Sequence, residues 1–136
     1  MKRAWFVAVI LAATLGGCTA SRTEADTVPS ITPAESARLL GHDTSVVFLD
    51  VRTSNEFQSE TGHLQGAIHI PVDSLEYGLA ELEPYRSRTI IAYCRTGHRS
   101  SRAQKFLAEK GFHALSMTGG ITRWNKEQLP VVKENH

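Results

Sequence analysis

Residues 89–100 have the sequence TIIAYCRTGHRS, in which a run of β-branched and apolar residues leads into a basic loop. An amphipathic stretch follows over residues 101–110 and ends at Gly111. This pattern predicts a buried strand over 89–93, a tight loop, and a helix over 101–110 that the glycine terminates. Strands that alternate with helices along the chain are typical of an α/β domain with a mostly parallel sheet.

The loop places Cys94 beneath the beginning of a helix. Backbone N–H groups at a helix N-terminus have no partner in the helix and point at an anion. Arg95 and Arg99 add positive charge, and His98 adds more when it is protonated. These features favour the thiolate, which is the nucleophilic form of cysteine. The sequence therefore predicts a catalytic cysteine in an anion-binding loop, and the alternative is a buried structural cysteine beside a basic turn.

The length of this loop distinguishes between two kinds of thiol chemistry. Four residues separate Cys94 from Arg99. Thiol phosphatases and arsenate reductases with a similar loop have five residues between cysteine and arginine, and the arginine position here holds Ser100. A shorter loop makes a smaller cradle, which suits a terminal sulfur atom better than a tetrahedral phosphate. Loop length therefore favours sulfur transfer.

Two further segments and the cysteine loop together resemble a single-domain rhodanese. The N-terminal signature is matched by Leu49–Arg52, Glu56-Phe57 and Gly62–Pro71, and the C-terminal signature by Gly119–Trp124. The resemblance covers about residues 31–132 and keeps the order of the family. It implies a rhodanese-like three-layer α/β domain, in which helices flank a mostly parallel central sheet.

The resemblance also implies a sulfurtransferase of the thiosulfate type. Cys94 would take a sulfane sulfur from a small sulfur-containing anion such as thiosulfate and hold it as a persulfide. A thiol or cyanide acceptor, including a protein thiol, would then remove it, with no cofactor and no metal. The expected substrate-binding residues are those that follow the cysteine: Arg95, Thr96, Gly97, His98 and Arg99.

Three alternative functions remain open at this point. One is a phosphatase or arsenate reductase, which the loop length disfavours. Another is a non-catalytic rhodanese module that binds a partner or an anion without turnover. The third is a persulfide carrier that serves an exported protein partner.

Asp50 and Arg52 follow a continuous apolar run over 46–49, which predicts a buried parallel strand. Groups at the carboxyl ends of such strands face the ligand site. The two residues either touch the site or, as we favour, form a charged pair that supports it. The histidines at 42, 63 and 69 match no standard metal-ligand spacing, so no metal site is predicted. We expect His63 to bond within its turn and His69 to pack at a strand edge.

The other expected elements follow from local patterns. Thr32 and Glu35 form a capping box for a helix that ends before Gly41. Pro84 should end a helix in which leucines share one face. Trp124 should lie on a helix after two glycines, in the core or at the wall of the substrate pocket. Besides the strands at 46–49 and 89–93 and the helix at 101–110, the predicted elements are helix 33–40, helical turn 54–57, strand 67–70, helix 74–83, strand 113–116, and the helix after 117–120.

The N-terminal residues have the pattern of an export signal. A basic start at residues 1–3 precedes an apolar run of twelve residues over 4–15, too short for a spanning helix and typical of a signal peptide. The sequence Leu-Gly-Gly-Cys at 15–18 resembles the bacterial lipoprotein box. It predicts a signal peptide over 1–17, lipidation at Cys18, a tether over 18–30, the domain over 31–132 and a tail over 133–136. The alternatives are an ordinary signal peptide with a chance cysteine, or an uncleaved anchor.

This pattern places the protein on the periplasmic side of a bacterial membrane. Thr19, in place of aspartate, favours the outer membrane by resemblance to lipoprotein sorting. Cys94 would then be the only free thiol of the mature chain. The formal net charge is +1 and falls to −1 without Lys2 and Arg3, so a nucleic-acid partner is not predicted.

Overall fold

The computed structural model describes residues 27–134. The predicted signal peptide, the lipidation site at Cys18 and most of the predicted tether lie outside this range, as do residues 135 and 136. Within the described part of the chain, no helix is both long and apolar enough to cross a membrane.

A five-stranded parallel sheet forms the centre of the domain, in the order β1-β5-β4-β2-β3. The strands are β1 (Ser30–Ile31), β2 (Val46–Asp50), β3 (Ile68–His69), β4 (Thr89–Tyr93) and β5 (His113–Met117). Because all the strands run in one direction, their carboxyl ends meet at the same edge of the sheet. Cys94 follows β4, the middle strand, directly at this edge.

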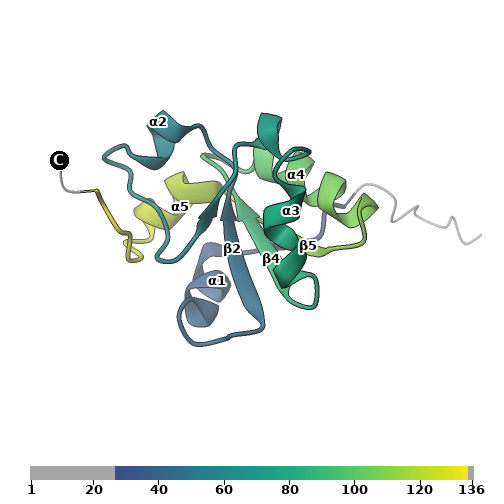
Figure 1. Cartoon of the computed structure of the whole chain (residues 1–136). Coiled ribbons are helices and arrows are strands. Elements are labelled where there is room, and N and C mark those ends of the chain that lie inside the picture. The colour runs from purple at the N-terminus through teal and green to yellow at the C-terminus, as the bar shows by residue number, and fades with distance from the viewer. Residues whose placement is uncertain (1–26, 135–136) are drawn as a thin grey trace, which may run out of the picture.

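Helices cover both faces of the sheet (Figure 1). The α-helices are α1 (Pro33–Leu39), α2 (Ser54–Phe57), α3 (Leu79–Leu82), α4 (His98–Glu109) and α5 (Gly120–Lys126), and the 3-10 turns are η2 (Val72–Ser74) and η3 (Glu83–Tyr85). One apolar core lies under α3 and α4 and includes Cys94. A second core lies under α1 and α5 and includes Trp124. These layers confirm the predicted three-layer α/β fold.

The helix predicted over 74–83 is wrong as a continuous element. The chain instead forms η2, a turn, α3 and η3 in succession. Gly78 lies in the middle of this stretch, packed so close to Ile70 that a Cβ atom would come within 2.8 Å of its side chain. Glycine is a poor helix former, and Pro84 lacks the N–H that would extend α3. Leu75 and Leu82 are nevertheless fully buried, whereas Leu79 is half-buried.

The start of the helix after Cys94 and one edge strand also differ from the prediction. The helix after Cys94 begins at His98, so the last three residues of the predicted loop are already helical. Gly97 makes this early start possible, because it takes a left-handed conformation (φ 111°) just before the helix. Strand β1 was not predicted, because a strand of two residues carries no detectable periodicity. It pairs with β5 at the edge of the sheet.

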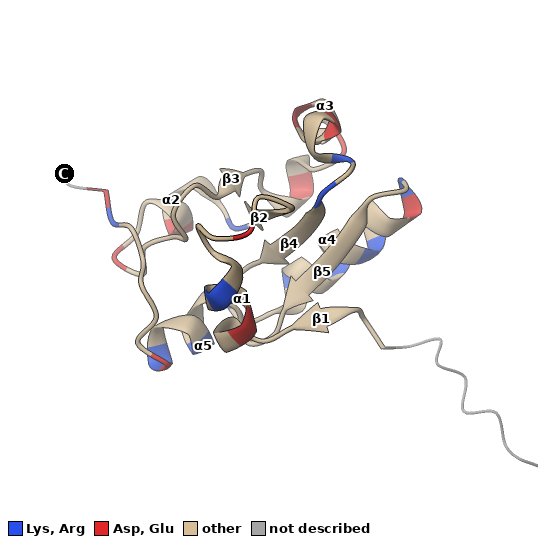
Figure 2. Ribbon diagram, turned by 90° about the horizontal axis from the view of Figure 1, so that it is seen from below, with Lys and Arg blue, Asp and Glu red and all other residues tan. Residues whose placement is uncertain are grey.

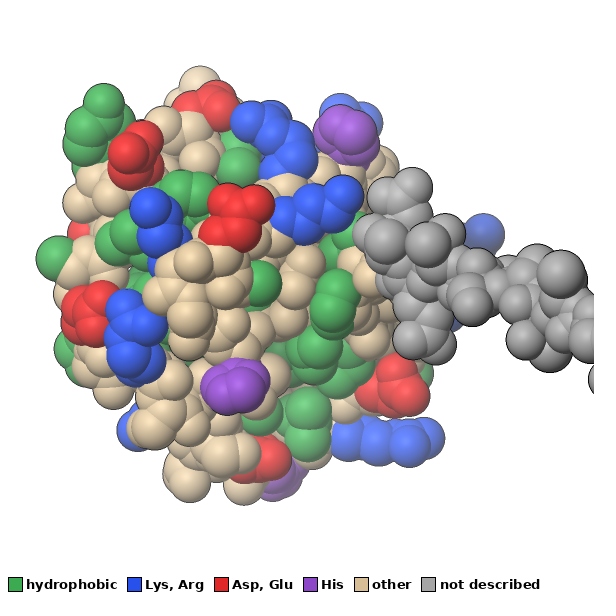
Figure 3. Space-filling view, turned by 90° about the vertical axis from the view of Figure 1, so that its right-hand side faces the viewer, with side chains coloured by type: hydrophobic (Ala, Val, Ile, Leu, Met, Phe, Trp, Pro, Cys, Tyr) green, Lys and Arg blue, Asp and Glu red, His purple; other side chains and the backbone are tan. Residues whose placement is uncertain are grey.

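Charged residues of both signs are spread over the domain (Figure 2). Figure 3 shows the same mixture on the right-hand face of Figure 1, where Lys and Arg side chains lie beside Asp and Glu. The face in Figure 3 shows no broad area of a single sign of charge. This distribution agrees with the near-zero net charge of the chain.

Candidate active site

The loop after β4 holds the Cys94 sulfur against backbone N–H groups. The Gly97 N–H donates to Cys94 Sγ at 3.1 Å, and the Ser100 N–H donates at 3.4 Å. Both bonds arise because α4 begins beside the sulfur and its first N–H groups lack helical partners. The side chain of Cys94 is almost completely buried, with 1% exposed. Two backbone N–H groups at the beginning of α4 therefore point at the buried Cys94 sulfur.

The surroundings of Cys94 lower the pKa of its thiol. Burial acts in the opposite direction, because it disfavours the charged form. The hydroxyl of Ser100 and the backbone N–H groups of Ser100, Gly97 and Thr96 outweigh burial, since they stabilise the thiolate by hydrogen bonding. The arrangement thus favours a reactive sulfur rather than an inert buried cysteine.

The beginning of α5 fixes the other side of the loop. The Ile121 N–H donates to the carbonyl oxygen of Cys94 at 2.8 Å, and the Thr122 N–H donates to that of Arg95 at 3.0 Å. Gly120 makes this approach possible, because a Cβ atom there would lie 2.4 Å from the Cys94 oxygen. This close approach explains why a side chain is absent at residue 120.

Arg99 forms an ion pair with Glu56 of α2. The two terminal guanidinium nitrogens of Arg99, Nη1 and Nη2, donate to the carboxylate of Glu56, at 2.7 Å each. Hydrogen bonding from Arg99, partly opposed by burial, lowers the pKa of Glu56 to about 2. The charge of Arg99 is therefore matched by a carboxylate, and its guanidinium ties the cysteine loop to the segment after β2.

Arg95, Thr96 and His98 lie on the exposed rim of the loop. Over residues 27–134, the Arg95 side chain takes part in no hydrogen bond or ion pair. It lines a pocket of about 210 Å³. Ile121, Arg52 and Thr61 also line this pocket. Of the two loop arginines, Arg95 is therefore the one whose charge is available to an anion.

Asp50 and Arg52 form the charged pair that the sequence favoured. Arg52 Nη2 lies 2.6 Å from Asp50 Oδ2, and both side chains are fully buried. Arg52 also donates to Thr61 Oγ1 at 2.9 Å and to the Gly62 carbonyl at 2.8 Å. The pair therefore braces the loop between α2 and β3. This network lies beside the cysteine loop, since Asp50 is paired with Tyr93 of β4 and Arg52 lines a pocket together with Arg95.

Phe57 is stacked between the rings of His63 and His69. The ring centroids are 4.0 Å and 4.4 Å from Phe57, at interplanar angles of 10° and 20°. His63 Nδ1 lies 3.1 Å from the Leu64 carbonyl, and His69 Nε2 lies 2.8 Å from the Arg52 carbonyl. Both imidazoles are thus used in packing and local hydrogen bonds, as expected. In the described chain, no group of three or more His, Cys, Asp or Glu residues is arranged to hold a metal ion.

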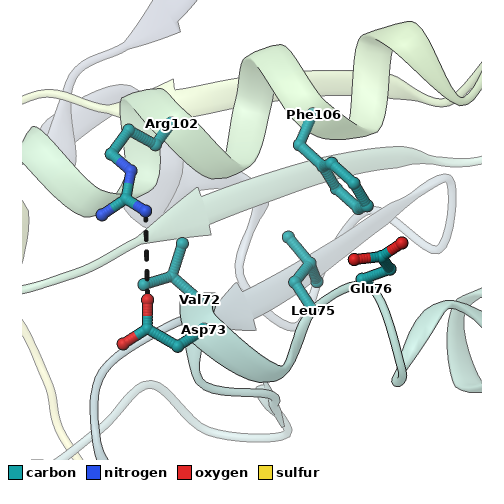
Figure 4. A pocket seen from close by; sticks show the side chains of 6 residues that line it. All are labelled: Val72, Asp73, Leu75, Glu76, Arg102 and Phe106. Atoms are coloured by element: carbon teal, nitrogen blue, oxygen red, sulfur yellow. Dashed lines mark ion pairs between the residues drawn. The ribbon is translucent and has the colours of Figure 1, made fainter.

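A second pocket lies between α4 and the segment after β3 (Figure 4). It has a volume of about 350 Å³, and Leu75 and Phe106 form its apolar part. Arg102 and Asp73 face each other at one end, 3.9 Å apart. Cys94 does not line this pocket. The cysteine loop, rather than this pocket, therefore carries the candidate chemistry.

Comparison with protein-family models matches residues 32–127 to the rhodanese-like domain. This chain belongs to the rhodanese-like domain family. It is 34% identical over 74 residues to the thiosulfate sulfurtransferase PspE of Escherichia coli strain K12, covering 54% of this chain and 69% of that protein. It is 30% identical over 94 residues to a sulfurtransferase of Allochromatium vinosum, covering 68% and 84% of the two chains.

Solved rhodanese-like structures have the same fold. A rhodanese-related protein of Thermoplasma volcanium superposes with a TM-score of 0.70 and 31% identity, over 78% of this chain and 99% of that one. A rhodanese-like domain protein of Staphylococcus aureus gives a TM-score of 0.67 at 27% identity, over 78% and 100%. The family and the fold that the sequence implied are therefore confirmed, and relatives of this rhodanese-like domain include sulfurtransferases.

Sequence analysis of the rhodanese-like loop missed two roles. Glu56 was noted only as part of a signature, and its pairing with Arg99 needs a contact across 43 positions of sequence. Ser100 was noted only as a position without arginine, although its hydroxyl lies 3.6 Å from the Cys94 sulfur. A capping box at Thr53 and Glu56 was the available sequence signal for the first, but it indicates only the start of a helix.

Proposed function

We propose that this rhodanese-like domain is a sulfurtransferase whose nucleophile is Cys94. The observation that carries the proposal is the position of Cys94 Sγ, 3.1 Å from the Gly97 N–H and 3.4 Å from the Ser100 N–H at the beginning of α4. Such a site stabilises a thiolate and, after reaction, an anionic persulfide. The sulfurtransferases among its relatives support the same reaction class.

The reaction consists of two half-reactions. In the first, the Cys94 thiolate attacks the outer sulfur of a donor such as thiosulfate. A new sulfur–sulfur bond forms on Cys94 while the donor's own bond breaks, and sulfite leaves with the electron pair. In the second, an acceptor thiolate or cyanide attacks the outer sulfur of the Cys94 persulfide. The acceptor leaves as a persulfide or as thiocyanate, and the Cys94 thiolate is regenerated.

Arg95 is the proposed binding group for the anionic donor. Its guanidinium is exposed and borders a pocket of about 210 Å³ beside the loop. Arg99 instead contributes by holding the loop, because its charge is matched by Glu56 at 2.7 Å. Gly97 contributes its N–H and its left-handed backbone, and Thr96 contributes a backbone N–H to the sulfur. His98 lies at the exposed rim and is not required as a base, since the thiolate is already favoured.

We further propose that the domain works outside the cytoplasm as a lipoprotein. The apolar run at residues 4–15 and the Leu-Gly-Gly-Cys sequence at 15–18 support export and lipidation at Cys18. Two or more acyl chains would give stable anchoring, and Thr19 favours the outer membrane. The sulfur acceptor would then be an exported thiol, either small or on a partner protein.

The test uses a chain that begins at Thr19, assayed for sulfur transfer from thiosulfate to cyanide. The Cys94→Ser variant is the control, because it removes the thiolate and leaves a side chain of similar size. We expect turnover in the wild type and none in the variant. Incubation with thiosulfate should add about 32 Da, one sulfur atom, to the Cys94 peptide. A folded wild-type domain that neither turns over nor forms this adduct with any donor tried would overturn the proposal.

A further inference from the structure

Three serine side chains lie directly behind the Cys94 sulfur. Ser100 and Ser101 belong to the first turn of α4, and Ser116 belongs to β5. Ser100 Oγ lies 3.6 Å from Cys94 Sγ and 2.8 Å from Ser116 Oγ. Ser100 is fully buried and Ser116 is only 3% exposed. The sulfur is therefore linked through one hydroxyl to a second hydroxyl on the neighbouring strand.

The register of the sheet places Ser116 at this position. Ser116 is paired with Ala92 of β4, two residues before Cys94. Side chains two residues apart in a strand point to the same face, so Ala92, Ser116 and Cys94 share one face of the sheet. On the other side, Ser116 is paired with Ser30 of β1, and its N–H donates to the carbonyl of Pro29, just before that strand, at 2.9 Å. Ser116 is thus fixed from both sides.

A count of hydrogens shows where the Ser100 hydroxyl points. A serine hydroxyl has one hydrogen to donate and two lone pairs to accept with. Ser100 Oγ has three neighbours that can accept this hydrogen: Cys94 Sγ, Ser116 Oγ, and the Gly97 carbonyl at 3.1 Å. The Gly97 carbonyl already accepts from Ser101 Oγ at 2.8 Å and from the Ser101 N–H at 3.1 Å. Its two lone pairs are therefore filled without Ser100.

The neighbours of the Ser116 hydroxyl favour one direction for the bond between Ser100 and Ser116. Within residues 27–134, its hydroxyl has two hydrogen-bonding neighbours, Ser100 Oγ at 2.8 Å and Ser101 Oγ at the longer distance of 3.5 Å. Donation from Ser116 to Ser100 is therefore the shorter bond. It leaves the Ser100 hydrogen free to point at the sulfur when Cys94 is ionised.

We propose that Ser116 is a positioning residue for Cys94, because its hydroxyl donates to Ser100 and so directs the Ser100 hydroxyl toward the ionised sulfur. This inference rests on the proposed role of Cys94 as the nucleophile. Ser116 does not touch the sulfur and acts only through Ser100. Among the groups around Cys94, burial raises the pKa of the thiol, and the Ser100 hydroxyl is the foremost of those that lower it. The orientation of that hydroxyl therefore matters to how readily the sulfur ionises.

The experiment measures how the alkylation of Cys94 by iodoacetamide depends on pH. The full chain is used, and mass spectrometry of the Cys94 peptide keeps Cys18 from contributing. The variants are Ser116→Ala and the matched pair Ser116→Thr and Ser116→Val, which have the same shape and differ in the hydroxyl. Ser36→Ala is a control, because Ser36 is fully buried on α1 and its hydroxyl has no hydrogen-bond partner among residues 27–134.

We expect Ser116→Ala and Ser116→Val to move the midpoint of alkylation upward by about 0.5–1 pH unit. Near neutral pH, their alkylation should be about 3–10-fold slower than that of the wild type. Ser116→Thr and Ser36→Ala should keep the wild-type midpoint. Far-UV circular dichroism confirms that each variant is folded. If Ser116→Ala fails to fold, the alkylation midpoints of Ser116→Thr and Ser116→Val can still be compared, because these two variants have the same shape and differ only in the hydroxyl.

Two results would overturn the inference. One is an alkylation midpoint equal to that of the wild type in folded Ser116→Ala and Ser116→Val, which lack the hydroxyl. The other is an equal shift in Ser116→Thr and Ser116→Val, because the hydroxyl would then make no difference. Alkylation needs no sulfur donor, so this test does not depend on sulfur transfer. If the proposed sulfur transfer were wrong, the wild type would show no turnover with thiosulfate and cyanide, while Cys94 would still be alkylated with a low pH midpoint.

Discussion

Arg99 and Glu56 are joined by two hydrogen bonds of 2.7 Å each, across 43 positions of sequence. The pair connects α4, which begins beside Cys94, to α2, which follows β2. Because both charges are only partly exposed, the pair is screened by solvent less than a fully exposed one. It therefore acts as a clamp on the cysteine loop.

This clamp makes the stability of the domain depend on pH. The pKa of Glu56 falls from 4.5 to about 2 in the folded domain, so the stabilisation is complete above about pH 5 and is lost as the pH falls toward 2. Glu56→Gln should lower the free energy of unfolding by about 1–2 kcal/mol at pH 7 and by much less at pH 2. Urea unfolding at several pH values measures the difference.

Glu76→Gln is the matched control for this prediction. Glu76 is exposed and, within the described residues, forms no ion pair. Its stability curve should follow that of the wild type at every pH. A constant gap between Glu56→Gln and the wild type from pH 7 to pH 2 would contradict the assigned role of the clamp.

Replacing Arg95 should weaken donor binding without changing the thiolate. Arg95→Ala should lower kcat/KM for thiosulfate by about 10-fold or more, chiefly through KM, because a guanidinium–anion contact is lost. Alkylation of Cys94 by the neutral reagent iodoacetamide should change little. Steady-state kinetics at low and high salt measure the effect, which should shrink as salt screens the wild-type charge.

Arg102→Ala provides the comparison for Arg95. Arg102 lies on α4 outside the loop, and its side chain is 60% exposed. Its removal should leave kcat/KM for thiosulfate within about 2-fold of the wild type. Equal losses in the two variants would indicate general electrostatic attraction instead of a specific contact at Arg95.

Gly120→Ala should displace the cysteine loop. The added Cβ would lie 2.4 Å from the Cys94 oxygen and 2.5 Å from the Arg95 carbonyl, and the backbone there has φ 56°. We expect a loss of about 2–3 kcal/mol in the free energy of unfolding, together with loss of sulfur transfer. Gly66→Ala is the control, since Gly66 has φ 72° but no atom within 4 Å of an added Cβ. It should lose only about 1 kcal/mol and remain active.

Both glycine variants are measured by urea unfolding and by the thiosulfate–cyanide assay. The difference between them isolates the steric clash from the cost of a positive φ. If Gly120→Ala retained full activity, the close approach of α5 to the loop would not be needed for catalysis.

Gln128→Gly should stabilise the domain. Gln128 is the one non-glycine residue with positive φ (57°) between residues 27 and 134. It follows α5 in a Schellman motif, in which Leu129 N–H donates to the Trp124 carbonyl and Gln128 N–H donates to the Asn125 carbonyl. Glycine relieves the strain, although it also frees the unfolded chain, so we expect a net gain of about 0.5–1 kcal/mol.

Thermal and urea unfolding of Gln128→Gly and Gln128→Ala measure this gain. Alanine keeps a Cβ atom at the same positive φ and should leave the stability close to that of the wild type. A similar gain from both substitutions would show that the glutamine side chain, and not backbone strain, is the cause.

The cysteine loop was largely predictable from the sequence because its determinants are local. Strand β4, the glycine at 97 and the basic residues around Cys94 are adjacent in the chain, and so are the residues that form the capping box of α1. The local alternation of strands and helices also predicted the α/β fold with its mostly parallel sheet. These features depend on periodicity, capping and backbone conformation, which act over a few residues.

Tertiary structure alone decided which charges and hydroxyls meet. The ion pair of Arg99 with Glu56 joins residues 43 positions apart, and the contact of Ser116 with Ser100 joins residues 16 positions apart. The breaking of the predicted helix at 74–83 had a similar origin, since Gly78 packs against Ile70 of the strand region before it. Sequence patterns fix which residues form each element, but the pairing register and packing of those elements set the distances on which the chemistry at Cys94 depends.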